Sequence, residues 1–223
     1  MTEIIKEYGL SKADMAKALV RGMGVDRIEV TGERYTIINN DCVKETESMQ
    51  ENSVDLILTS IPFSTQYEYS PNYADFGHTD NNDHFFKQMD YLTPNLLKVL
   101  KPGRIAAIHV KDRIVPGGMT GLGFQTVYPF HAQCISHYTR HGFGYMGMKT
   151  IVTDVVRENN QTYRLGWTEQ CKDGSKMGVG MPEYLLLFRK PPTCTENAYA
   201  DQSVVKSKSE YTRAKWQIDA HGF

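Results

Sequence analysis

The residues best suited to do chemistry form a short loop, Ser60-Ile61-Pro62-Phe63. The apolar, partly branched run at residues 54–58 just before it is typical of a buried parallel strand. Open α/β sheets carry their chemistry just beyond the carboxyl ends of such strands. We therefore expect this loop at the functional edge of a sheet, where it offers a hydroxyl group, free backbone carbonyls and an aromatic face to a flat ligand.

The predicted elements around this loop form a βαβ unit. A long polar and aromatic loop, residues 64–82, leads to a helix that Asp83 would cap and that Pro94 should bend or split. The turn at residues 101–104 then enters a second buried strand at residues 105–110. The two strands would lie side by side in a parallel sheet.

Shorter patterns complete the predicted organisation. Glycines and helical or strand-like periodicity predict further helices, strands and loops on both sides of the βαβ unit. The last two strands could form a reversed edge of the sheet. These elements are helices at residues 11–22 and 125–140, a helical turn at 43–49, strands at 35–38, 148–156 and 184–188, and a glycine-rich loop at 116–123.

Composition restricts the class of protein. The 223 residues are 40% hydrophobic and 23% charged, which is typical of a soluble domain with room for a core. A net charge of −1 offers no general argument for nucleic acid, so any such binding must come from local patches. Four cysteines without a CxxC pair argue for free thiols and against zinc. We expect a cytoplasmic protein without a membrane segment.

Four ordered segments across residues 35–192 resemble the amino-group DNA methyltransferases, in the permuted class whose catalytic motif precedes the cofactor motif. Several of these segments resemble the forms found in phage and prophage methylases. The segments are Asn40-Asp41-Cys42 and residues 52–63, 96–104 and 183–190. The resemblance implies a Rossmann-like α/β sheet with flanking helices that transfers a methyl group from S-adenosyl-L-methionine. The acceptor would be N6 of adenine or N4 of cytosine in DNA, on a base flipped out of the duplex.

The resemblance also implies roles for individual residues. An aromatic amine is a poor nucleophile, and acceptors such as Ser60 Oγ and the Ile61 carbonyl would favour a pyramidal nitrogen. Phe63 would stack on the flipped base, and neither a metal nor a covalent intermediate is needed. Ile61 replaces the first proline of the family motif. The implied sets are catalytic Ser60, Ile61, Pro62 and Phe63; cofactor-binding Asp41, Thr59 and Ser60; and DNA-binding Tyr67, Tyr69, Arg157 and Arg164.

Each of these roles has a simpler alternative. Ser60 could merely end a strand, Phe63 could pack in the core, and Asp41 could cap a helix. Arg157 and Arg164 could be solvated loop charges. Instead of an active DNA methyltransferase, the chain could be a non-catalytic DNA-binding or assembly subunit, or a methyltransferase for RNA or protein.

One expected feature is missing from the sequence. The cofactor motif of this class, Phe-x-Gly-x-Gly, does not occur after Phe188. We therefore expect an incomplete cofactor half, completed by a missing C-terminal segment or a second chain, and weak binding of the cofactor to this chain alone. The expected domains are an N-terminal helical extension at 1–30, a catalytic half at 31–192 and a linker with the start of the missing half at 193–223.

Overall fold

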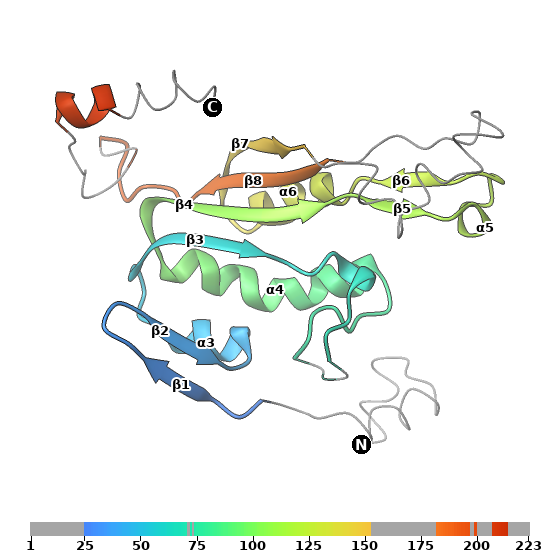
Figure 1. Ribbon diagram of the computed structural model, residues 1–223, viewed down its shortest axis with the longest axis horizontal. Helices are drawn as coiled ribbons and strands as arrows, with labels where there is room; N and C mark the ends of the chain where they lie inside the picture. Colours follow the sequence, from blue (N-terminus) through green and yellow to red (C-terminus); the bar gives the residue numbers. More distant parts are fainter. Residues whose placement is uncertain are drawn as a thin grey trace.

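The centre of the molecule is a four-stranded mixed sheet with the order β3-β4-β8-β7 (Figure 1). β3 (Val54–Ser60) is parallel to β4 (Leu100–Lys111), whereas β8 (Glu183–Arg189) runs antiparallel to both β4 and β7 (Gly144–Ile151). The predicted α/β class with flanking helices is confirmed, and the two late strands lie at one edge as expected. The computed structural model describes residues 25–70, 72, 74–152, 182–196, 199 and 207–213.

Two hairpins and several helices surround this sheet. β1 and β2 form an antiparallel hairpin of their own, and the β5–β6 hairpin extends away from the sheet (Figure 1). The bounds of these elements are β1 (Ile28–Thr31), β2 (Thr36–Asn39), α3 (Cys42–Ser48), η1 (Ser64–Gln66), α4 (Asn82–Val99), β5 (Arg113–Val115), α5 (Gly117–Thr120), β6 (Thr126–Tyr128) and α6 (Phe130–Arg140).

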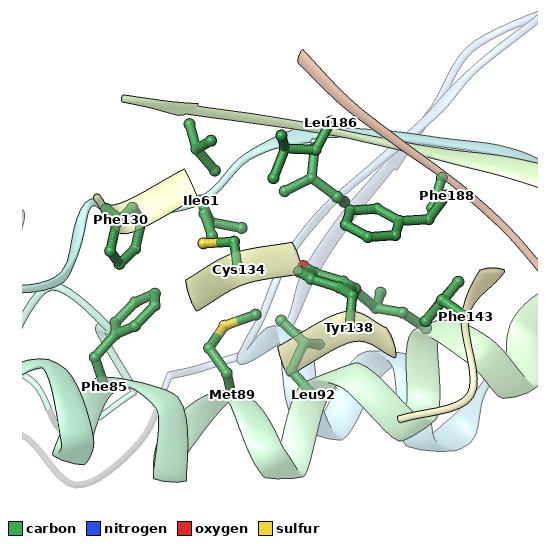
Figure 2. Packing of buried hydrophobic residues seen from close by; sticks show 14 of the residues in the cluster. Ile61, Phe85, Met89, Leu92, Phe130, Cys134, Tyr138, Phe143, Leu186 and Phe188 are labelled. Carbon is green, nitrogen blue, oxygen red and sulfur yellow. The ribbon is translucent and has the colours of Figure 1, made fainter. Parts of the chain in front are cut away.

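The hydrophobic core lies between one face of the sheet and the helices α4 and α6. Figure 2 shows Met89 of α4 and Tyr138 of α6 beneath Leu186 and Phe188 of β8. The Tyr138 and Phe188 rings stack with centroids 4.8 Å apart. Because all four residues are almost inaccessible to solvent, the burial of this contact surface stabilises the fold.

The opposite face of the sheet carries a second set of side chains. Residues alternate between the two faces of a strand, so the register places Leu58, Ala107 and Leu187 together on the face away from the core. Leu58 is 67% exposed there, so β3 is not the fully buried strand that its apolar run predicted. Within the described part of the chain, β3 hydrogen-bonds to β4 only, so its outer edge is available to another strand.

Three further predictions about the elements around the core are corrected by the structure. The helix expected at 125–140 is a strand, β6, followed by α6, because Pro129 separates the two. The turn expected at 101–104 is part of the extended strand β4. The cap of α4 is Asn81, whose side chain accepts a hydrogen bond from the His84 backbone N–H at 2.9 Å, rather than Asp83.

Three other predictions concern Pro94, the strand at 35–38 and the helix at 11–22. Pro94 does not split α4, which continues to Val99. The strand expected at 35–38 is β2, which belongs to the separate hairpin. The predicted helix at 11–22 lies outside the described residues, and the domain boundaries remain predictions.

Candidate active site

Ser60 is the last residue of β3 and is exposed to solvent. Its Oγ lies 3.0 Å from Nδ1 of His109, which is its register partner on the parallel strand β4. The two side chains meet because paired positions of neighbouring strands point to the same face of a sheet. The serine hydroxyl is therefore held by a contact within the sheet rather than by its own loop.

His109 is in turn held by a carboxylate from the third strand. Its Nε2 lies 2.8 Å from Oε2 of Glu183 on β8, and Lys111 Nζ lies 3.1 Å from the other oxygen of the same carboxylate. A carboxylate only accepts hydrogen bonds, so Nε2 carries the proton. In the neutral imidazole, Nδ1 then accepts a hydrogen bond from the Ser60 hydroxyl, whose oxygen can still accept hydrogen bonds itself.

The Glu183 carboxylate is stabilised in its ionised form. Partial burial raises its pKa, but the hydrogen bonds from His109 and Lys111 outweigh burial and leave the pKa below its ordinary value. Glu183 is therefore a carboxylate at neutral pH. Ser60, His109, Lys111 and Glu183 form one hydrogen-bonded chain across three strands, which we call the Ser60 relay.

The rest of the predicted catalytic loop is more deeply placed than Ser60. Ile61 is buried and belongs to the core cluster, and Pro62 is half-buried. Phe63 is only 8% exposed. Its ring makes edge-type contacts with Tyr67, His109 and Phe130, with centroids 6.0, 5.8 and 6.4 Å away. Phe63 is therefore largely enclosed by neighbouring rings, and its role in stacking on a base remains a prediction.

Two tyrosines follow this loop and project into solvent. Tyr67 is 40% and Tyr69 75% exposed, and their ring centroids are 6.3 Å apart. The loop that carries them is ordered by Asp75, whose carboxylate accepts hydrogen bonds from the backbone N–H groups of Tyr69 and Ser70 at 2.7 Å each. Exposed rings on a braced loop are suited to stacking against unpaired bases.

Arg113 anchors the start of the same loop. Its guanidinium donates to Thr65 Oγ1 at 3.0 Å and to Asn82 Oδ1 at the start of α4. It also lies over the rings of Tyr128 and Phe130, 5.2 and 5.5 Å from their centroids. The β5–β6 hairpin and α4 thus fix the chain just beyond Phe63.

Besides Ser60, the predicted cofactor residues are Asp41 and Thr59, and their described contacts are structural. The Asp41 Oδ1 accepts from the Val43 backbone N–H at 2.9 Å and caps α3. β2, the strand before it, lies in a separate hairpin. Thr59 is half-buried, and its register partner is Ile108. The cofactor role of these residues remains a prediction.

Two members of the Ser60 relay, His109 and Glu183, were not among the predicted site residues. The signal for His109 was its place near the end of the strand next to β3. Glu183 lies 74 residues further along the chain, and no local pattern connects it to Ser60. Of the four predicted DNA-binding residues, Tyr67 and Tyr69 lie near the loop, whereas Arg157 and Arg164 lie outside the described residues.

Comparison with known proteins finds likeness in structure only. No known family and no curated protein matches the sequence. A protein of Thermus thermophilus named as a DNA modification methylase shares 18% identity with a TM-score of 0.48, over 78% of this chain and 56% of that chain. A structure of the same protein complexed with S-adenosyl-L-methionine gives 19% identity and the same TM-score.

The cytosine-N4-specific PvuII DNA methyltransferase shares 14% identity with a TM-score of 0.44, over 81% of this chain and 61% of that chain. This chain therefore spans less than two thirds of the solved chains it resembles. The likeness is low and assigns no function to this chain.

None of the helices within the described ranges is long and apolar enough to cross a lipid bilayer.

Proposed function

We propose that this chain carries the catalytic residues of an S-adenosyl-L-methionine-dependent DNA methyltransferase that acts on N6 of adenine or N4 of cytosine. The observation that carries the proposal is the Ser60 relay at the carboxyl end of a parallel strand. An exposed hydroxyl can accept a hydrogen bond from an amine. The Ile61 carbonyl, next in the chain, is the expected second acceptor.

The relay explains how a serine hydroxyl, which is a weak hydrogen-bond acceptor, could orient the amine of the base. Ser60 directs its own proton to His109 Nδ1, so its Oγ can accept a hydrogen bond from the exocyclic amine of the base. That bond would orient the lone pair of the amine nitrogen toward the methyl group of the cofactor. An alkylated amine becomes more acidic and must lose a proton. Ser60 can take that proton while its own passes to His109, and Glu183 stabilises the resulting imidazolium.

S-adenosyl-L-methionine, when bound, would supply the electrophilic methyl group. We expect a further segment to complete the site that binds it. The outer edge of β3 and the apolar face around Leu58 are the surfaces to which such a segment could dock. Calorimetric titration of this chain alone should therefore show weak or absent cofactor binding; tight, stoichiometric binding would contradict this expectation.

DNA contact is proposed for four residues of this chain. Tyr67 and Tyr69 would stack on bases or close over the target, and Arg157 and Arg164 would bind phosphates. Movement of Tyr67 away from Phe63 would open the Phe63 ring to the flipped base.

The central test is methyl transfer from labelled cofactor to duplex DNA by the complete protein. Ser60→Ala should abolish most of the label, whereas Ser48→Ala, which removes an exposed hydroxyl on α3, should leave it unchanged. Mass analysis of the nucleosides would identify the methylated base. Normal DNA binding without label would favour a non-catalytic subunit, and label in RNA or protein alone would favour a different acceptor.

The relay also favours a second candidate function, acyl transfer. A serine bonded to a histidine that is bonded to a carboxylate has the connectivity of nucleophile, base and orienting acid in hydrolases, although the two ring nitrogens are exchanged here, with Nδ1 facing the serine and Nε2 the carboxylate. A fluorophosphonate probe would react covalently with Ser60 in that case and with none of its neighbours. Absence of such labelling, with methyl transfer present, would exclude this function.

A further inference from the structure

We propose that Asp90, His137 and His141 form a binding site for a divalent transition-metal ion such as Zn²⁺, linking α4 to the end of α6. One ligand atom of each of these three side chains lies within 4.8 Å of those of the other two. The site is independent of the proposed methyl transfer, and the sequence analysis had predicted no metal. His137-x-x-x-His141 was the signal in the sequence, but Asp90 lies on another helix.

The two helices bring the three donor atoms to one point. His137 and His141 are four residues apart, so they share one face of α6, and their ring centroids are 4.6 Å apart. Asp90 of α4 faces them, with Oδ1 2.7 Å from His141 Nε2 and 3.7 Å from His137 Nδ1. Small side-chain movements would bring all three atoms to metal-ligand distance.

His137 is oriented by a second contact of the kind that supports metal ligands. Its Nε2 lies 2.8 Å from Oγ1 of Thr93, which is fully buried one turn along α4 from Asp90. A histidine that donates its other ring N–H to a fixed acceptor keeps one orientation and one tautomer. Thr93 therefore directs the lone pair of His137 Nδ1 toward Asp90.

The electrostatic state of His137 is compatible with ligation. Burial, together with the neighbouring His141 and Arg140, outweighs the opposing influence of Asp90 and lowers the pKa of His137 to about 4. The imidazole is therefore neutral at neutral pH, and its lone pair is available without loss of a proton.

Arg140 is the one group among the described contacts of the site that competes with a metal ion. Its Nη2 donates to Asp90 Oδ1 at 2.9 Å and lies 3.3 Å from His137 Nδ1. Its side chain is 63% exposed and long, so it can swing into solvent. We infer that Arg140 supplies the positive charge beside Asp90 in the metal-free protein and gives it up when the ion binds.

The donor set selects the class of ion. Two imidazole nitrogens and one carboxylate oxygen suit Zn²⁺, Co²⁺, Ni²⁺ or Cu²⁺, whereas Mg²⁺ and Ca²⁺ prefer oxygen donors. Because the Asp90 side chain is exposed, water can take the fourth position. An ion bound only by the folded state would also stabilise the contact between α4 and α6.

The test uses untagged full-length protein treated with a chelator and then titrated with Co²⁺ and Zn²⁺. We expect stoichiometric binding by calorimetry, visible Co²⁺ ligand-field bands typical of four-coordination, and a rise in melting temperature with Zn²⁺. Asp90→Asn and His141→Gln should each abolish stoichiometric binding. Thr93→Val should weaken it roughly 10- to 100-fold, as loss of an orienting partner does at other metal sites.

Two control variants separate a metal site from an ion-pair network. Arg140→Gln should retain or tighten metal binding because it removes the competing cation. His84→Gln removes an exposed histidine that pairs with Asp80 at 3.2 Å and should have no effect. Absence of stoichiometric binding to the unmodified chain would overturn the proposal, as would binding that survives both Asp90→Asn and His141→Gln.

Discussion

Ser60 Oγ and His109 Nδ1 lie 3.0 Å apart across two parallel strands, at paired positions of the register. The contact turns a solvent-exposed hydroxyl into an acceptor of fixed direction. Because Glu183 holds the far side of the His109 ring, the direction of the Ser60 hydroxyl depends on the strand order of the whole sheet. The following predictions test this arrangement and the fold that supports it.

Ser60 and His109 should act as a unit in methyl transfer. His109→Ala should lower kcat roughly 10²-fold because Ser60 loses its proton acceptor, and it should also lower stability at neutral pH because the Glu183 carboxylate loses a hydrogen-bond donor. In a Ser60→Ala background the same substitution should cost almost nothing more, because only a shared contact produces such non-additivity. The measurement is kcat for the four proteins of the cycle. Additive losses would mean that His109 acts independently of Ser60.

Glu183 should contribute stability that depends on pH. Its folded-state pKa is depressed, so its contribution is present above the ordinary glutamate pKa of about 4.3 and is lost as the pH falls through the folded value. Glu183→Gln should therefore lower stability at neutral pH and flatten the acid limb of the profile. Urea unfolding from neutral to acid pH measures this, with the 90% exposed Glu33→Gln as control. Parallel profiles for wild type and Glu183→Gln would contradict it.

Gly77 should be required for the loop that presents the two tyrosines. A Cβ at position 77 would overlap the backbone carbonyl oxygen of Tyr67. Gly77→Ala should cost about 1–3 kcal/mol and weaken binding of single-stranded DNA, because the loop must shift. Gly118→Ala is the matched control, since a Cβ there meets nothing within 4 Å. Denaturant unfolding and fluorescence anisotropy measure the two effects, and equal behaviour of both variants would refute the prediction.

Tyr138 should tolerate loss of its hydroxyl. The hydroxyl is fully buried without a hydrogen-bond partner among the described residues, and burial raises its pKa well above the ordinary value. Tyr138→Phe should leave stability unchanged or raise it by up to about 1 kcal/mol, because an unsatisfied polar group leaves the core. Phe188→Ala, which removes the ring stacked on Tyr138, should cost about 3–5 kcal/mol. Thermal or urea unfolding measures the stability of both variants. A marked loss of stability in Tyr138→Phe would mean that the hydroxyl has a hydrogen-bond partner.

Sequence patterns correctly predicted the elements whose formation depends on residues close together in the chain. The apolar run at 54–58 marked β3, the periodic helix marked α4, and the strand at 184–188 was found as β8. The same patterns failed for elements whose structure depends on contacts between residues far apart in the chain. Pro102 and Gly103 look like a turn, yet they continue β4, and Gly103 takes a φ of 73° while donating its N–H to Lys190.

By itself, the sequence determined that Ser60 ends a strand and that a βαβ unit follows, because strand and helix periods are local properties of the chain. It could not place His109 beside Ser60 or bring Glu183 across 74 residues to the same ring. Strand pairing is set by burial of one sheet face against α4 and α6, and only that packing chooses the register. The register of β3 and β4 places Ser60 beside His109 and so makes the serine part of the Ser60 relay.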